Sequence, residues 1–115
     1  MPYNENDEFL GVLDLLTERA LVYDKTSRGA VWEEKPIPES LRAEATKWRH
    51  HLIEKASEQD PALFEKYCAE QPISVEELKP AIRRATLSRA IIPVLCGSAF
   101  KDIGVQKLLD AVVDY

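Results

Sequence analysis

The spacing of apolar residues changes along the chain from a pattern typical of strands to one typical of helices. The stretch FLGVLDLLTERALVY mixes Val, Leu and Tyr with polar breaks, which predicts a half-buried strand or a strand pair. After the turn-forming residues DKTSRG, the stretch AVWEEKPIP predicts a second strand. Pro36 and Pro38 confine that strand to an edge, or mark its end, because proline has no N–H group for an inner ladder. We therefore expect a small antiparallel sheet over residues 8–37.

Two glycines mark places where the backbone is expected to need special freedom. Gly11 interrupts a strand pattern, which predicts a bulge or a close approach of another backbone. Gly29 ends a cluster of turn-forming residues and is able to adopt a positive φ there.

From Ser40 onward the apolar residues follow a helical period. They lie three or four residues apart, so they form one stripe on a helix over about 40–58. Ser40 or Glu39 is expected to cap its start. The stripe consists of Leu41, Ala45, Trp48, Leu52 and Ala56.

Two further helices are predicted from their start signals. Asp60 followed by Pro61 is typical of a cap and a first-turn proline, and it predicts a helix over about 61–69. Ser74 and Glu77 have the spacing of a capping box, which predicts a helix over about 75–88. We expect a kink inside this helix at Pro80.

The last 25 residues predict a strand, a loop and a helix. AIIPVLC is a continuous apolar run, typical of a strand covered on both faces. The following loop consists of small residues, and a buried stripe of Val105, Leu108, Leu109 and Val112 predicts a final helix. The whole pattern predicts an α+β fold.

Composition narrows the function further. The chain has 115 residues with a formal net charge of −5, which disfavours DNA as a direct ligand and favours a basic partner. The two cysteines, Cys68 and Cys96, lie in apolar runs and are expected to be inert core thiols in a reducing cytoplasm. No apolar run is long enough for a membrane span, and no metal-ligand spacing is present. His50 and His51 lie about 100° apart on one helix and so cannot share a metal.

Motifs for catalysis are also absent from these residues. There is no GxxxxGK[ST] phosphate loop, no GxGxxG and no serine in a Gly-x-Ser-x-Gly turn. Whether the chain belongs to an enzyme is left open by this pattern, but a self-contained active site is not expected. Trp32 and Trp48 are expected in the core, since no basic groove accompanies them.

Three long stretches resemble one continuous segment of bacterial-type translation elongation factor G. These are GVLDLLTERALVY, IPESLRAEATKWRHHLIEKASEQDPALFEKY and PVLCGSAFKDIGVQKLLDAVVDY, in the same order and with similar spacing. The resemblance implies a G′ insertion subdomain over 1–90, followed over 91–115 by the last strand and helix of a P-loop GTPase domain. The family's phosphate loop, switch regions and NKxD motif lie upstream of such a segment.

The resemblance also implies a role for the loop after the apolar run. Gly97 to Ala99 correspond to the fifth guanine-nucleotide motif, in which Ser98 shapes the turn and the Ala99 N–H group donates to guanine O6. Lys101 stands where the family has a lysine near the base. The sequence departs from the commoner family string at Asp102 and Ile103, beyond the base-contacting loop. The implied ligands are GTP or GDP with Mg²⁺ in a full-length parent, and none in this segment alone.

A partner surface is implied on the long helix. Glu54 and Glu58 are four residues apart on its polar side, so their carboxylates lie on adjacent turns. They correspond to family glutamates that meet the C-terminal domain of the stalk protein of the large ribosomal subunit. Pro61 replaces a third acidic residue found in some members.

Two functions are consistent with these features. The first is a segment of a cytoplasmic ribosomal translocation GTPase, in which the G′ region contacts the stalk and tunes GTP hydrolysis. The second is a free-standing α+β interaction module that binds a basic protein. Under the first, residues after about Ala90 are expected to be disordered, to repack onto the rest of the chain, or to pair two copies through an exposed strand.

Overall fold

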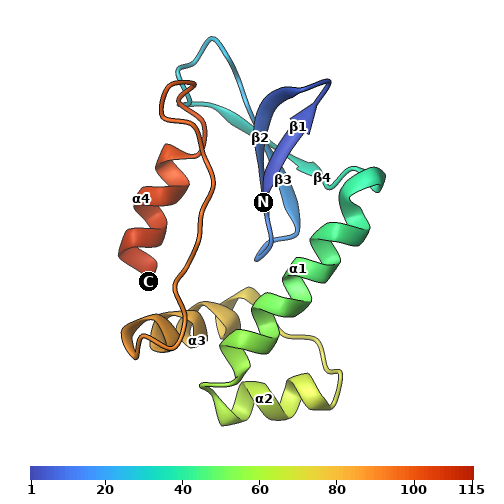
Figure 1. The fold of residues 1–115 in the computed structure, drawn as a ribbon, viewed down its shortest axis with the longest axis vertical. Coiled ribbons are helices and arrows are strands. Elements are labelled where there is room, and N and C mark those ends of the chain that lie inside the picture. Colours follow the sequence, from blue (N-terminus) through green and yellow to red (C-terminus); the bar gives the residue numbers. More distant parts are fainter.

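Four antiparallel strands are followed by four helices in the computed structural model, which describes residues 1–115. The strands pair in sequence order, so β4 is an edge strand as its prolines predict (Figure 1). The predicted α+β fold, a small antiparallel sheet with helices, is confirmed. The strands are β1 (Pro2–Glu5), β2 (Glu8–Asp14), β3 (Arg19–Tyr23) and β4 (Trp32–Pro36).

Strand β1 belongs to the sheet but precedes the range 8–37 over which the sheet is expected. It is joined to β2 by Asn6 and Asp7, whose φ angles are 49° and 62°. Asn and Asp tolerate this left-handed conformation, and two such residues in a row favour a tight hairpin turn. The Asn-Asp pair is therefore a hairpin signal that the apolar pattern alone does not use.

Gly11 lies where β1, β2 and β3 meet. A Cβ atom at this position would be 1.9 Å from the Leu21 carbonyl oxygen of β3, so only glycine fits. The register between β1 and β2 also shifts between Tyr3 and Asn4, opposite Gly11 and Phe9. The predicted close approach of another backbone is thus confirmed, next to an irregularity in the pairing.

The helices are α1 (Glu39–Ser57), α2 (Pro61–Cys68), α3 (Val75–Leu87) and α4 (Val105–Asp114). Asp60 accepts hydrogen bonds from the N–H groups of Ala62 and Leu63, and Ser74 and Glu77 form a complete capping box, so both start signals are confirmed. Helix α3 continues through Pro80. None of the helices combines the length and the apolar character that a membrane crossing requires.

The expected cap of α1 by Ser40 or Glu39 is wrong. Pro38 occupies the N-cap position, and no side chain caps the helix. Both expected residues lie inside the first turn, where the Glu39 carboxylate is 3.2 Å from the Arg42 guanidinium. An acidic residue there stabilises the helix through its macrodipole.

Two residues expected in the core are exposed. Trp48 is 45% exposed, although Ala45 and Ala56 on the same stripe are buried. Ala45 packs against the sheet and Ala56 packs against α2 and α3, so Trp48 lies between the two contact regions. Cys68 is exposed at the end of α2, whereas Cys96 is half-buried, and neither forms a disulfide.

The apolar run before the last loop forms no strand, contrary to prediction. Residues 91–96 have no sheet partner, and Ile92 and Val94 are 86% and 91% exposed. The run connects α3 to the last loop and contacts the rest of the chain through Ile91 and Cys96. An inner strand needs neighbours on both sides, and the four-stranded sheet offers none here. Ile91 and Cys96 pack onto the rest of the chain, whereas Ile92, Val94 and Leu95 are exposed.

Helix α4 forms as predicted, but the prediction that its apolar stripe is buried is wrong. The expected core residues are exposed, and only Ala111 of this helix is buried. Periodicity identifies the apolar side of α4 correctly, yet nothing in the chain covers it. The exposed residues are Val105, Leu108, Leu109 and Val112.

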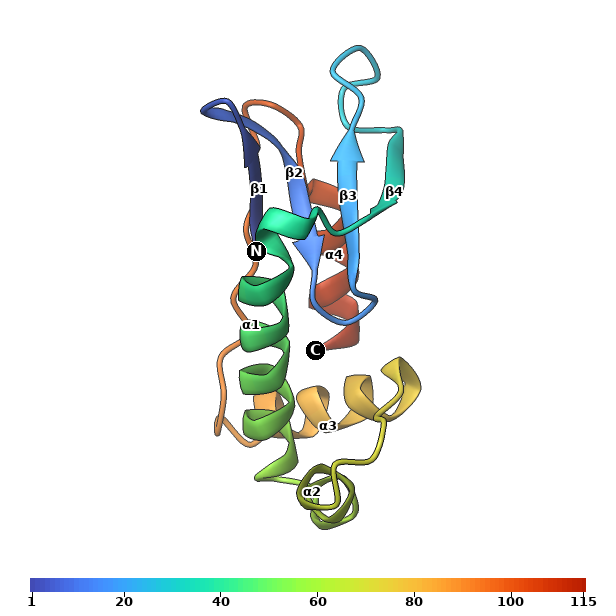
Figure 2. The same ribbon diagram turned by 90° about the vertical axis from the view of Figure 1, so that its right-hand side faces the viewer.

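The sheet is covered on both faces. Leu13 and Ala20 point toward α1 and pack with Ala45, whereas Val12 and Leu21 pack with Ile103 on the other face. This division follows from the alternation of side chains along each strand. Figure 2 shows α1 in front of the sheet and α4 behind it.

Helix α4 is fastened to α3 at its C-terminal end. The Arg83 guanidinium donates to the carbonyl oxygens of Val113 and Asp114, at 3.0 and 2.9 Å. The Lys79 ammonium donates to the Asp114 carboxylate at 2.7 Å. Cationic groups at this end also interact favourably with the helix dipole.

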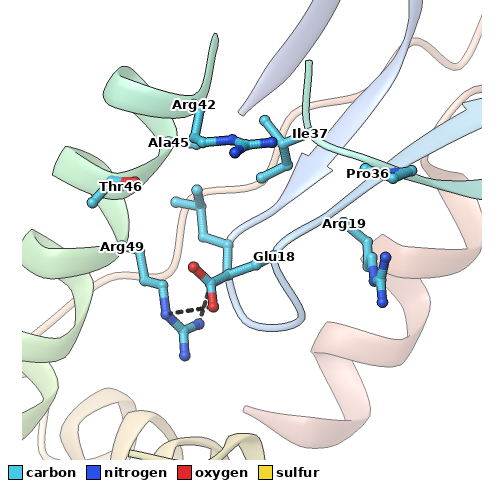
Figure 3. A pocket seen from close by; sticks show the side chains of 9 residues that line it. Glu18, Arg19, Pro36, Ile37, Arg42, Ala45, Thr46 and Arg49 are labelled. Carbon is cyan, nitrogen blue, oxygen red and sulfur yellow. Dashed lines mark hydrogen bonds and ion pairs between the residues drawn. The ribbon is translucent and has the colours of Figure 1, made fainter. Parts of the chain in front are cut away.

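Arg49 of α1 fastens the helix to the turn between β2 and β3. Its guanidinium donates to the carbonyl oxygens of Leu15 and Leu16, at 2.5 and 2.7 Å, and lies 3.5 Å from the Glu18 carboxylate. Figure 3 shows Arg49 and Glu18 facing each other across a hollow between α1 and the sheet. The Arg49 side chain is only 15% exposed, so these contacts are shielded from water.

We expect Arg49→Met to lower the free energy of unfolding by about 2 kcal/mol, because it leaves two carbonyl groups and Glu18 without their charged donor. The matched control is Arg42→Met on the same helix, whose side chain is 60% exposed and makes one ion pair. Its loss should be about 0.5 kcal/mol or less. Urea unfolding followed by circular dichroism measures both, and equal losses would contradict this role for Arg49.

The capping box predicts a dependence of stability on pH. The Lys66 hydrogen bond, followed by the Ser74 N–H group, holds the pKa of Glu77 below 4.5 in the folded chain. A lowered folded pKa gives stability that is complete above about pH 4.5 and lost as the pH falls through the folded pKa. We therefore expect Tm to fall less steeply between pH 5 and pH 3 in Glu77→Gln than in the wild type. Glu76→Gln, an exposed neighbour without an ion pair, should keep the wild-type slope.

Candidate functional site

The loop between residues 97 and 104 is a closed turn. Ser98 and Ile103 exchange two backbone hydrogen bonds of 2.9 Å, which bring the two ends of the loop together. The Lys101 N–H group donates to the Ser98 carbonyl oxygen at 3.2 Å and lies 3.3 Å from its Oγ. The Asp102 N–H group donates in turn to the Ala99 carbonyl oxygen at 3.2 Å. The turn is therefore shaped by its own backbone and by the Ser98 hydroxyl.

Ala99 carries one of the unpaired backbone donors of this loop, next to that of Phe100. The Ala99 N–H group donates to no acceptor in the protein, and the residue is exposed. The small side chains at 97–99 leave room for a flat ligand to approach this donor. Because the turn fixes the backbone, the donor can recognise a carbonyl oxygen without a large loss of conformational entropy.

Lys101 extends from the same turn into solvent, on the side of the hairpin between β1 and β2. The pKa of Glu8 in that hairpin is lowered, chiefly by the hydrogen bond and charge of Lys25 and further by the charge of Lys101. The structure thus brings Ser98, Ala99 and Lys101 together on one exposed turn, as expected for a contiguous loop.

The remainder of a nucleotide site is not contributed by these residues. The chain has no glycine-rich phosphate loop, and no group of three or more His, Cys, Asp or Glu side chains could hold a metal ion. The loop can therefore offer one fixed donor and a lysine to the edge of a base, while phosphates and a cation would need other residues.

Glu54 and Glu58 lie on the outer side of α1, about half exposed, as the helical spacing predicts. Each interacts with a cation or a titratable ring on its own helix. The Lys55 ammonium donates to the Glu58 carboxylate at 2.6 Å, and this hydrogen bond raises the pKa of Lys55. The His51 ring lies 3.6 Å from the Glu54 carboxylate. A basic partner would have to compete with Lys55 for Glu58.

A cleft of about 500 Å³ lies between the sheet, α1, the 91–96 run and α4. The pattern of apolar residues in the sequence does not predict this cleft. Its lining is mainly apolar and includes Trp48, Leu52, Ile82, Ile92 and Val94. The only sign of the cleft in the sequence is the apolar run 91–96. The pattern of that run favours an inner strand and not the wall of a cleft.

The hollow of Figure 3 has a volume of about 330 Å³ and includes three arginines, Arg19, Arg42 and Arg49. Two of their charges are balanced by carboxylates, since Arg42 pairs with Glu39 and Arg49 with Glu18. Figure 3 shows the Arg42 guanidinium beside Ile37 and those of Arg19 and Arg49 at separate places, so the three groups do not meet. The side chains that line this hollow therefore stabilise the contact between α1 and the sheet.

No protein-family model matches the chain. A protein of Thermus thermophilus with a known crystal structure is similar in fold, with a TM-score of 0.83 and 25% sequence identity. The match covers 99% of this chain and 17% of that protein. The chain thus spans about one sixth of the length of the solved structure that it matches.

Proposed function

We propose that this chain is part of a GTPase of the translation elongation factor G type. It would comprise the G′ region and the final loop and helix of the GTPase domain. The observation that carries the proposal is the exposed Ala99 N–H group, held by a closed turn within the string CGSAFK. A fixed backbone donor beside small side chains suits guanine O6, because O6 is an acceptor that adenine lacks.

The exposed surface of the chain supports membership of a larger body. Its accessible area is 7757 Å², whereas a compact monomer of 13.1 kDa exposes about 6,400 Å². The excess includes the apolar run 91–96 and the outer side of α4. Apolar surface of this extent favours contact with further protein. It also disfavours the alternative, a free-standing module, which would bury these residues within itself.

In this proposal the parent uses GTP hydrolysis on the ribosome to move tRNA and mRNA in the cytoplasm. Phosphates and Mg²⁺ would be held by residues outside this chain, and Mg²⁺ would neutralise charge developing on the transferred phosphoryl group. Residues 97–101 would bind the guanine edge. Glu54 and Glu58 of α1 would guide the stalk protein of the large ribosomal subunit, which tunes the GTPase cycle.

The native polypeptide that contains this chain is expected to carry GxxxxGK[ST] and NKxD motifs upstream of these residues. The chain alone should show no saturable binding of labelled GDP below about 1 mM, because phosphate and Mg²⁺ contacts supply most of the affinity. A fluorescence titration measures this. Micromolar binding by the chain alone, or a native polypeptide without those motifs, would overturn the proposal.

The stalk contact is tested by charge reversal. Glu54→Lys with Glu58→Lys should weaken binding to the stalk C-terminal domain by about 2- to 30-fold, since each exposed ion pair contributes about 0.2–1 kcal/mol. The difference should shrink in about 0.5 M salt because exposed charges are screened.

The matched control reverses two carboxylates at the other end of the molecule. Glu33→Lys with Glu34→Lys on β4 makes the same change in net charge, and both residues are exposed. Calorimetric titration of both double variants separates a local contact from a general effect of charge. Equal affinities of the two variants would remove Glu54 and Glu58 from the interface.

A further inference from the structure

The turn between β3 and β4 holds the 97–104 loop from outside. The Gln106 Nε2 group, at the start of α4, donates to the Gly29 carbonyl oxygen at 2.8 Å. Gly29 has a φ of 75°, and a Cβ atom there would lie 1.9 Å from the Asp102 carbonyl oxygen. Figure 1 shows this turn beside the loop that precedes α4. The two segments thus touch through backbone, and Gly29 is required for that approach.

Neighbouring contacts fix the loop on the same face of the sheet. Ile103 is buried against Val12 and Leu21. The Lys107 ammonium lies 5.8 Å from the centroid of the Trp32 ring, within the range of a cation–π interaction. The loop therefore rests on the sheet through residues on both sides of the Gly29–Gln106 contact.

The Gln106 side chain shows that this contact is specific. Its Oε1 atom is buried without a hydrogen-bond partner. A buried amide that satisfies only one of its two groups is unfavourable, so an apolar side chain would be the simpler occupant if packing were the only requirement. The hydrogen bond from Nε2 to the Gly29 carbonyl oxygen compensates for the unsatisfied Oε1 atom and accounts for glutamine at this position.

We propose that the Gly29–Gln106 contact positions the Ala99 N–H group, so that the β3–β4 turn governs discrimination of guanine O6. Gln106 is a positioning residue in this role, which rests on the proposed function of the loop. The path is short, because Gln106 is the second residue of α4 and lies three residues after Ile103, which closes the turn with Ser98. A shift of that turn moves the fixed donor relative to any base held by the rest of the parent.

The test uses the native polypeptide that contains the chain and two nucleotides. GDP is compared with 2-aminopurine riboside diphosphate, which has no O6. The wild type should prefer GDP by about 10-fold or more, because the analogue lacks both O6 and the N1–H donor of guanine. In Gln106→Met, which keeps the volume but loses the donor, this preference should fall about 3- to 10-fold through weaker GDP binding. Affinity for the analogue should stay unchanged.

Gln71→Met, after α2, is the matched control, since it makes the same substitution at an exposed residue far from the loop in the sequence. Its preference for GDP should equal that of the wild type. A purely structural role of Gln106 would instead lower both affinities together, and such a result would overturn the inference. Gly29→Ala provides a second route, because its Cβ atom forces Asp102 away, and it should reduce the preference in the same direction.

Hydrogen exchange in the 115-residue chain tests the contact without any nucleotide. The Ser98 and Ile103 amides should exchange about 3- to 10-fold faster in Gln106→Met, while the Ala69 amide at the end of α2 should not change. Unchanged exchange in the loop would overturn the contact. A wild-type polypeptide that binds both nucleotides equally would overturn the proposed function itself, whereas a GDP preference retained in Gln106→Met would overturn only this inference.

Discussion

The hydrogen bonds of Arg49 determine how the helices sit on the sheet. Strand β2 is followed by two carbonyl groups, of Leu15 and Leu16, that no strand or helix satisfies, and buried carbonyl groups need a partner. A single guanidinium nitrogen, Nη1 of Arg49, donates to both, while its Nε lies near the Glu18 carboxylate. The apolar contact between α1 and the sheet is small and centres on Ala45. The direction of α1, and with it the place of its outer glutamates, therefore depends on this polar joint.

Helix α4 provides the second connection between the two ends of the molecule. Its first turn is tied to the sheet through Gln106 and the loop residue Ile103, and its last turn is tied to α3 through Arg83 and Lys79. The cleft lies between these two supports because the sheet and α3 share little direct packing. A rotation of α3 relative to the sheet would strain α4 and the loop before it.

The sequence predicts helix starts correctly where the determinants are local. The Asp60 cap and the Ser74 capping box both depend on residues within one helical turn. Helical periodicity reports which side of α4 is apolar, but it does not report whether another element covers that side. The same limit explains the missing strand at 91–96, whose apolar character requires neighbours that the sheet does not supply. The candidate loop can be found because its residues are contiguous. Gln106 cannot, because its partner Gly29 lies 77 residues away.

The 97–104 segment and α4 have apolar contacts in two directions. One side rests on the sheet through Ile103, and the other side presents exposed Leu109 and Val112. A segment that is apolar on both sides is suited to lie between two bodies. If the outer side meets the remainder of a GTPase domain, the Ala99 donor stands at the boundary between that domain and the sheet. Movement of either the sheet or that domain would then shift the Ala99 N–H group. Binding of a partner to α1 would in this way change the position of the donor relative to the guanine base.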